Sequence, residues 1–196
     1  MENKETVLVT GGSGFIASHC IIQLAAAGYK VKATVRDLSR TNKLNQTLLN
    51  GLEKHEGKSD LSVDWQVTNL SSDEGWDEAM AGCDYVLHVA SPIAMQLPKD
   101  EDEMVKPAVE GTLRVLKAAS KAGVKRVVVT SSVAAIMYGT DKEGIFNEED
   151  WTDPKSKTTN VYAKSKTLAE KAAWEFIEKD NSCLLYTSPS PRDLTT

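Results

Sequence analysis

The stretch TVLVTGGSGFIA, residues 6–17, decides the fold of this chain. A short apolar run over 7–9 passes through three closely spaced glycines into a helix-like pattern that continues to Ala27. This order of strand, glycine turn and helix is typical of a phosphate site. Glycines let the backbone approach a pyrophosphate, and the amide groups at the start of a helix attract the anion. A glycine turn alone is weak evidence, because most such turns only reverse the chain.

Short apolar runs alternate with helical patterns along the rest of the chain. The runs at 31–35, 61–67, 85–89 and 126–130 predict strands, and apolar residues recur at helical spacing between them. The nearly continuous run at 85–89 is typical of a strand buried on both faces, so His88 within it is expected to be a core residue. The repetition predicts an α/β fold of the Rossmann type, a doubly wound parallel sheet with helices on both faces.

Composition and charge narrow the class of protein. The 196 residues suffice for one substantial core, and the net charge of -5 with scattered basic residues argues against nucleic acid or anionic membrane as a partner. No apolar run reaches membrane-spanning length, and the first strand begins too early for a signal peptide. The three cysteines lack the spacing of a metal site. We therefore expect a cytoplasmic, metal-free protein of undetermined oligomeric state.

Arg36 directly follows the second predicted strand. In a dinucleotide fold the turn at this point lies beside the adenosine ribose. An acidic residue there accepts from the 2′-hydroxyl of NAD, whereas an arginine pairs with the 2′-phosphate of NADP. Lys43 would add a second positive charge, and the adjacent Asp37 leaves a solvated surface pair as the alternative. The sequence therefore predicts NADP(H) as the cofactor.

Tyr162 and Lys166 lie four residues apart in a predicted helix over 162–179, so the phenol and the ammonium share one face. A tyrosine with its ordinary pKa of about 10 is a poor acid–base catalyst at neutral pH, and a neighbouring cation lowers that pKa. The same ammonium can donate hydrogen bonds to the nicotinamide ribose. A lone Tyr-x-x-x-Lys pattern is common on exposed helices, so the pair needs support from other elements.

Thr130, Ser131 and Ser132 end the strand predicted at 126–130 and precede a predicted loop that extends to 159. In open α/β sheets ligands bind at the carboxyl ends of the strands, where these hydroxyls emerge. A serine hydroxyl there can donate to a substrate carbonyl as negative charge develops on its oxygen. A strand-end cap is the alternative, and spacing alone leaves open which serine points inward.

Together these features resemble the short-chain dehydrogenase/reductase family in its extended branch. The runs VLVTGGSGFIASH, ATVRD, CDYVLHVASP, VVVTSS and VYAKSK are similar to the group of dihydroflavonol reductases, cinnamoyl-CoA reductases and microbial aldehyde and ketone reductases. The resemblance covers residues 6–181 and implies NADPH-dependent reduction of an aldehyde or ketone, a small-molecule carbonyl substrate, to an alcohol. An extended-branch epimerase or dehydratase of nucleotide sugars and a non-catalytic NADP-sensing protein are the alternatives.

The resemblance also implies roles for individual residues. Tyr162 would protonate the carbonyl oxygen, Lys166 would hold the ribose, and Ser132 would orient the carbonyl. Asn69 departs from the pattern, since many relatives have an aspartate there that accepts from the adenine amino group. The residues expected to contact the cofactor are Gly11, Gly14, Phe15, Ile16, Arg36, Lys43, Asn69, Leu70, Val89, Ala90, Ser91, Tyr162 and Lys166.

The last residues depart from the repeating pattern. Another buried strand is due after residue 181, yet the sequence reads SCLLYTSPSPRDLTT. The string CLLYTSPSPRD resembles a translated sequencing adapter, and a natural Ser/Pro-rich disordered end is the alternative. We therefore expect residues 1–181 to form the NADP-binding Rossmann domain with the catalytic helix, residues 182–196 to be a non-native or disordered tail, and the sheet to be incomplete. The substrate domain would be missing, and a fragment of this kind is expected to be poorly soluble or to show little turnover.

Overall fold

Six parallel strands form one sheet in the order β3-β2-β1-β4-β5-β6. The computed structural model describes residues 5–56, 61–92, 98, 100–180 and 184–188. This strand order is that of a doubly wound Rossmann sheet, so the predicted fold class is confirmed. The strands are β1 (Thr6–Val9), β2 (Lys30–Val35), β3 (Val63–Val67), β4 (Tyr85–His88), β5 (Arg126–Thr130) and β6 (Leu184–Ser188).

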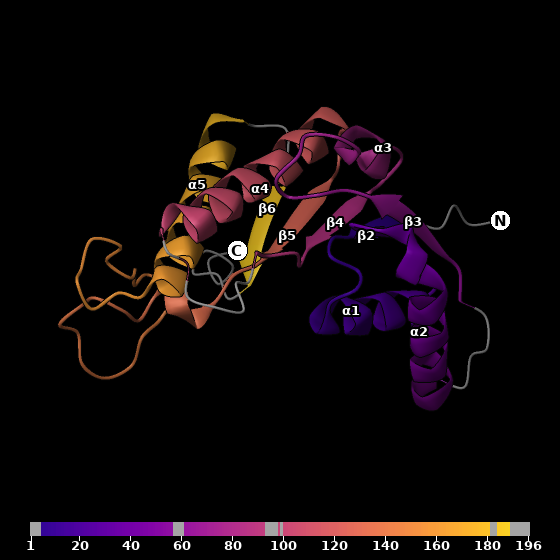
Figure 1. Cartoon of the computed structure of the whole chain (residues 1–196), viewed down its shortest axis with the longest axis horizontal. Coiled ribbons are helices and arrows are strands. Elements are labelled where there is room, and N and C mark those ends of the chain that lie inside the picture. Colours follow the sequence, from indigo (N-terminus) through magenta and orange to yellow (C-terminus); the bar gives the residue numbers. More distant parts are fainter. Residues whose placement is uncertain (1–4, 57–60, 93–97, 99, 181–183, 189–196) are drawn as a thin grey trace.

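Helices cover both faces of the sheet, as Figure 1 shows. Leu8 of β1 belongs to a buried cluster with residues of α3, α4 and α5, whereas its neighbour Val9 belongs to a cluster with residues of α1 and α2. Successive side chains of a strand point to opposite faces, so each strand contributes to two cores. The helices are α1 (Phe15–Ala26), α2 (Thr41–Glu56), α3 (Trp76–Met80), α4 (Asp102–Lys121) and α5 (Val161–Lys179), with short 3-10 turns η1 (Leu38–Arg40) and η2 (Val133–Ala135).

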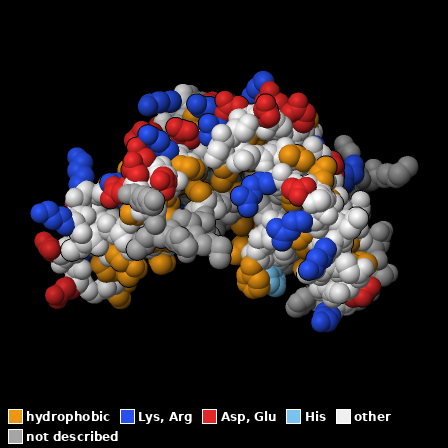
Figure 2. Space-filling model, in the orientation of Figure 1, with side chains coloured by type: hydrophobic (Ala, Val, Ile, Leu, Met, Phe, Trp, Pro, Cys, Tyr) orange, Lys and Arg blue, Asp and Glu red, His pale blue; other side chains and the backbone are white. Residues whose placement is uncertain are grey.

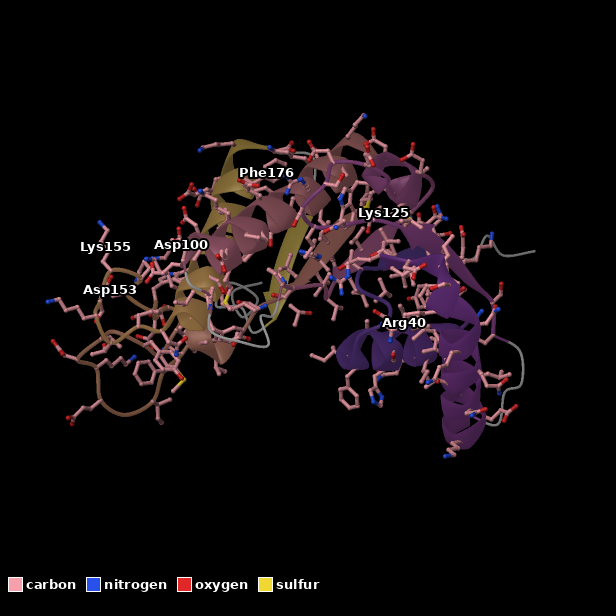
Figure 3. The ribbon with its side chains drawn as sticks, viewed as in Figure 1. Arg40, Asp100, Lys125, Asp153, Lys155 and Phe176 are labelled. Atoms are coloured by element: carbon pink, nitrogen blue, oxygen red, sulfur yellow. The ribbon has the colours of Figure 1, made fainter. Side chains whose placement is uncertain are left out.

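The amino ends of the central strands are tied together by charged side chains. Lys125, labelled in Figure 3, precedes β5 and forms ion pairs with Asp84 at 2.8 Å and with Glu5 at 3.2 Å. These hydrogen-bonded carboxylates raise the pKa of Lys125 above its ordinary value. Asp84 also accepts from the backbone amide of Thr6 at 2.8 Å. Structural contacts therefore occupy the amino ends of these strands. Ligands of open α/β sheets bind at the other end, where the carboxyl ends of the strands lie.

The segment after β5 follows the predicted loop over most of its length but is held firmly. Thr152 is fully buried, and its hydroxyl donates to Ala134 O at 2.8 Å and accepts from Tyr138 N at 2.9 Å. One threonine therefore fastens this loop to η2, which directly follows β5. The helix predicted at 162–179 is found as α5 immediately after the loop.

The predicted tail over 182–196 falls largely outside the described residues. Within it, Leu184–Ser188 are described as β6, which pairs in parallel with β5 at the place where the repeating pattern requires a strand. The assignment of the tail as non-native or disordered stays a prediction. None of the helices described here combines the length and the apolar character that crossing a bilayer requires.

Candidate active site

A cavity of about 670 Å³ opens at the carboxyl ends of β1, β2, β3 and β4. Figure 2 shows the surface hollowed between the part formed by α1 and α2 and the part formed by α4 and α5. The volume lies within the range of small-molecule sites, about 300–1,000 Å³. The cavity brings together ten of the residues predicted from sequence to contact a cofactor. They are Gly11, Gly14, Phe15, Ile16, Arg36, Asn69, Leu70, Val89, Ala90 and Ser91.

The glycine turn ends in a helix start that suits an anion. Gly14 precedes α1, and its amide donates to Gly11 O at 2.8 Å while its carbonyl accepts the first helical bond from Ser18 N at 2.9 Å. The amides of residues 15–17 therefore come before the first helical hydrogen bond and have no acceptor within the helix. The first turn of α1 contains no acidic residue that would compete for them. Both the free amides and the helix dipole favour a bound phosphate at this point.

Close packing explains the glycines of this turn. Gly11 has φ +70°, and a Cβ there would lie 3.1 Å from both Cα and Cβ of Ala90. At Gly12 a Cβ would lie 2.7 Å from the indole ring of Trp65 and 3.0 Å from the Cβ of Ala33. The turn therefore packs directly against its neighbouring segments. Because these two positions carry no side chain, a ligand can approach the backbone of the turn closely.

Gly11→Ala is expected to lower the free energy of unfolding by about 1 kcal/mol more than Gly82→Ala does. Gly82 has the same φ of +70°, but a Cβ there meets nothing within 4 Å. Both variants strain the backbone equally, so the difference measures the contact with Ala90. Urea unfolding of the two variants and the wild type gives this difference. Equal losses would show that the contact with Ala90 costs nothing.

Thr10 and His88 fix the wall of the cavity between β1 and β4. The Thr10 hydroxyl oxygen accepts from the amides of Val89 at 3.1 Å and Ala90 at 3.0 Å, and it lies 2.9 Å from Nδ1 of His88. Because both acceptor positions of the oxygen are used, its hydrogen is donated to Nδ1. His88 is therefore neutral and carries its proton on Nε2. Burial, aided by the positive charge of Lys166, lowers the pKa of His88 to about 3, and its prediction as a core histidine is confirmed.

The buried neutral His88 makes the stability of the fold dependent on pH. Histidine in the unfolded chain takes a proton near pH 6.5, whereas folded His88 does so only near pH 3. Between these values the unfolded state binds more protons, so the free energy of unfolding falls as the pH drops from 6.5 towards 3, by up to about 5 kcal/mol. We expect His88→Asn to show a shallower fall than the wild type in urea unfolding at a series of pH values.

The exposed His19 supplies the control for this measurement. His19→Asn is expected to keep the wild-type slope of the free energy of unfolding against pH. An unchanged slope in His88→Asn would mean that other groups cause the acid sensitivity.

The segment after β3 is fixed by side chains from two helices. Nε1 of Trp76 donates to the carbonyl oxygens of Asn69 at 3.2 Å and Ser72 at 3.0 Å, and Nη1 of Arg114 donates to Leu70 O at 2.7 Å. The side-chain oxygen of Asn69 accepts from Ser71 N at 3.0 Å. One acceptor position of that amide oxygen therefore remains for a ligand, where a carboxylate would offer more.

Arg36 is exposed at the end of β2 and lines the main cavity. Its neighbour Asp37 instead accepts from the amide of Ser39 at 2.8 Å, and hydrogen bonds with Ser39 lower the pKa of Asp37. Within the described residues no ion pair joins Arg36 to Asp37. The pairing of Arg36 with a 2′-phosphate stays a prediction. Lys43 is exposed on α2 and does not line the cavity.

Tyr162 and Lys166 lie in the first turns of α5. Asn160 caps this helix by accepting from Ala163 N at 2.9 Å, and the Tyr162 side chain is 38% exposed. The ammonium of Lys166 donates to Thr130 O at 3.5 Å, a long hydrogen bond to the end of β5. Burial lowers the pKa of Lys166, and the carboxylate of Glu170 partly offsets this effect. Lys166 thus connects helix α5 with the end of strand β5.

The two serines after β5 differ in their contacts. The hydroxyl of Ser131 donates to Oε2 of Glu170, which turns it towards α5. The hydroxyl oxygen of Ser132 accepts from Ala134 N at 3.2 Å, which leaves its hydrogen as a donor. Of the two, Ser132 is therefore the candidate for a substrate contact, and this role stays a prediction.

Lys166 lines a second, small cavity of about 20 Å³ rather than the main one. The two cavities have four residues in common, so they adjoin; these are Leu70, Ala90, Ser91 and Pro92. Ser132 and Tyr162 line neither cavity. Sequence analysis missed Thr10 and Glu170, because their roles depend on contacts with His88 and Ser131, which lie far away along the chain. Within the described part of the chain, no three His, Cys, Asp or Glu residues are grouped so as to hold a metal ion.

Curated relatives of this chain are reductases. It is 40% identical over 185 residues to dihydroflavonol 4-reductase of Arabidopsis thaliana, covering 91% of this chain and 47% of that protein. It is 38% identical over 195 residues to anthocyanidin reductase ((2S)-flavan-3-ol-forming) of Vitis vinifera, covering 95% and 56%. The chain therefore spans about half the length of the curated relatives it matches.

Solved structures and a family model agree with these relatives. Yeast methylglyoxal/isovaleraldehyde reductase Gre2 complexed with NADPH superposes with a TM-score of 0.77 at 31% identity, covering 93% of this chain and 56% of that one. Vestitone reductase from alfalfa (Medicago sativa) gives a TM-score of 0.71 at 34% identity, covering 94% and 56%. The predicted resemblance to the extended short-chain dehydrogenases/reductases is confirmed, because the model of one family matches residues 7–190. The chain belongs to the NAD dependent epimerase/dehydratase family.

Proposed function

We propose that the protein carrying this chain reduces an aldehyde or ketone to an alcohol with NADPH. One observation carries the proposal: a glycine turn suited to phosphate and Arg36 line one cavity, and the first two turns of the adjoining helix α5 contain Tyr162 and Lys166. The relatives named above are reductases, and the Gre2 structure is a complex with NADPH. Arg36 favours NADPH over NAD and hence a reductase over a nucleotide-sugar epimerase.

The residues present fit this cofactor. The amides at 15–17 would hold the pyrophosphate, and Arg36 would pair with the 2′-phosphate. Asn69 and Leu70 would border the adenine, while the wall at 89–91 would lie against the nicotinamide half. NADPH supplies, when bound, a hydride for the carbonyl carbon. The cavity volume of about 670 Å³ is ample for a dinucleotide that lies partly in the open.

Three side chains would act on the carbonyl oxygen. The Tyr162 phenol donates its proton to that oxygen, and the Lys166 ammonium stabilises the phenolate that remains. The Ser132 hydroxyl donates a hydrogen bond to the same oxygen as its negative charge grows. Lys166 also donates to the nicotinamide ribose. The substrate is therefore held between the end of β5 and the start of α5.

The test is NADPH consumption by the purified protein, including any sequence that follows this chain, with a panel of aldehydes and ketones. We expect carbonyl-dependent oxidation of NADPH with one alcohol formed per NADPH, and slower turnover with NADH. If no carbonyl of the panel causes oxidation of NADPH, the proposal is contradicted. Conversion of a nucleotide sugar without net loss of cofactor would show an epimerase instead.

A further inference from the structure

Glu170 is a buried carboxylate that the proposed reaction does not use. It lies on α5, is only 4% exposed, and follows Lys166 by four residues. A glutamate is almost never buried to this extent unless it is paired. Its contacts therefore indicate what it does for the site.

The carboxylate of Glu170 accepts hydrogen bonds from two directions. The hydroxyl of Ser131 donates to Oε2, and Nε1 of Trp174 lies 3.4 Å from Oε1. Ser131 directly precedes Ser132, the candidate substrate contact. Glu170 thus links α5, which carries Tyr162 and Lys166, to the strand end that carries the serine.

The negative charge of Glu170 faces the positive charge of Lys166. Positions four apart share one helix face, and both side chains line the same small cavity. The other titratable residue that lines this cavity is His88 from β4, which is neutral; α4 contributes Ala108 and Thr112, and β5 contributes Thr130. Among the described residues around the cavity, Glu170 is therefore the counter-charge to Lys166. In a poorly hydrated site an opposite charge favours the charged form of its partner.

We propose that Glu170 is a positioning residue, whose carboxylate holds the Ser131–Ser132 strand end against α5 and keeps Lys166 charged beside Tyr162. The role of the charged lysine rests on the proposed function. The effect of the Glu170 charge on Lys166 does not, because it depends only on two side chains of α5 that line the same small cavity.

Glu170→Gln tests the pairing, since glutamine keeps the shape and an acceptor oxygen for Ser131 but removes the charge. Lys166 is titrated by the pH dependence of its reaction with an acylating reagent, read by mass spectrometry without cofactor or substrate. We expect the midpoint for Lys166 to fall by about one pH unit or more. The exposed Lys179 serves as internal reference, and Glu175→Gln, an exposed glutamate on the same helix, serves as matched control.

A Lys166 midpoint that is the same in Glu170→Gln and wild type would overturn the proposal, and so would an equal fall in Glu175→Gln. If Glu170→Gln does not fold by circular dichroism, Glu170→Asp decides. The aspartate side chain is one methylene shorter, so its charge lies further from Lys166. We expect it to lower the Lys166 midpoint measurably but by less than Glu170→Gln would. An unchanged midpoint would overturn the proposal. If the Lys166 midpoint shifts as expected but the protein reduces no carbonyl, the effect of Glu170 on Lys166 stands and only the proposed function is contradicted.

Discussion

Tyr162→Phe is expected to lower kcat for carbonyl reduction by a factor of about 10²–10⁴ while the affinity for NADPH stays within about twofold. Phenylalanine keeps the ring but has no proton to donate to the carbonyl oxygen. The Tyr162 side chain lies at the exposed start of α5, with 38% of its surface accessible, so loss of the hydroxyl leaves no buried group without a partner. The fold should therefore be unaffected.

Tyr29→Phe is the matched control, because Tyr29 is also 38% exposed but lies between α1 and β2. Steady-state oxidation of NADPH gives kcat, and fluorescence titration gives the affinity for NADPH. We expect Tyr29→Phe to retain wild-type values of both. A Tyr162→Phe variant with wild-type kcat would exclude Tyr162 as the acid. If Tyr162→Phe lost affinity for NADPH by the same factor as it lost kcat, Tyr162 would have a role in cofactor binding instead.

The fold was predictable because its signals are local. The apolar runs that became β1, β2, β4 and β5 each satisfy the pattern of a buried parallel strand, and the glycine turn marks the first crossover. The strand predicted at 61–67 begins two residues later, as β3. The order β3-β2-β1-β4-β5-β6 follows from short right-handed connections, which leave few alternatives.

The candidate site was predictable where backbone position alone decides. Ten of the predicted cofactor contacts line one cavity, because they lie after β1, β2, β3 and β4, in the turns or the helix start at the carboxyl ends of the same parallel sheet. Lys43 belongs to α2, and its distance from the cavity depends on the path of η1, which spacing does not fix. The difference between Ser131 and Ser132 depends on Glu170, a residue 39 positions away from Ser131 along the chain. Contacts of this kind follow from tertiary packing and have no local pattern.

Thr10 and His88 show the same limit. A threonine at the end of β1 and a histidine in β4 have no visible relation in the sequence, yet one hydroxyl joins them and fixes two amides of the cavity wall. Parallel pairing of β1 with β4 brings them together. The pairing was predictable from the fold class, but the hydrogen bond was not, because it depends on side-chain rotamers.

Arg36→Ala is expected to weaken NADPH binding by about 10- to 100-fold and to leave NADH binding within about twofold. Hydrogen bonds to a charged group contribute about 1.5–3 kcal/mol, and about 1.4 kcal/mol corresponds to a factor of ten in affinity. Only NADPH has the 2′-phosphate that the guanidinium would hold, so the loss should be confined to that cofactor. The neighbouring Asp37 is negatively charged and accepts from Ser39, so it cannot replace the lost contact with a phosphate.

Lys43→Ala separates a specific contact from the general effect of positive charge. Both variants remove one exposed cation, but Arg36 lines the cavity and Lys43 does not. If Arg36 pairs directly with the phosphate, Lys43→Ala should weaken NADPH binding by less than about threefold, and added salt should reduce even that effect. Titration of each variant with NADPH and NADH at two salt concentrations distinguishes these outcomes. Equal losses in the two variants would indicate a diffuse electrostatic effect, and an equal loss of NADH affinity in Arg36→Ala would show that Arg36 does not read the 2′-phosphate.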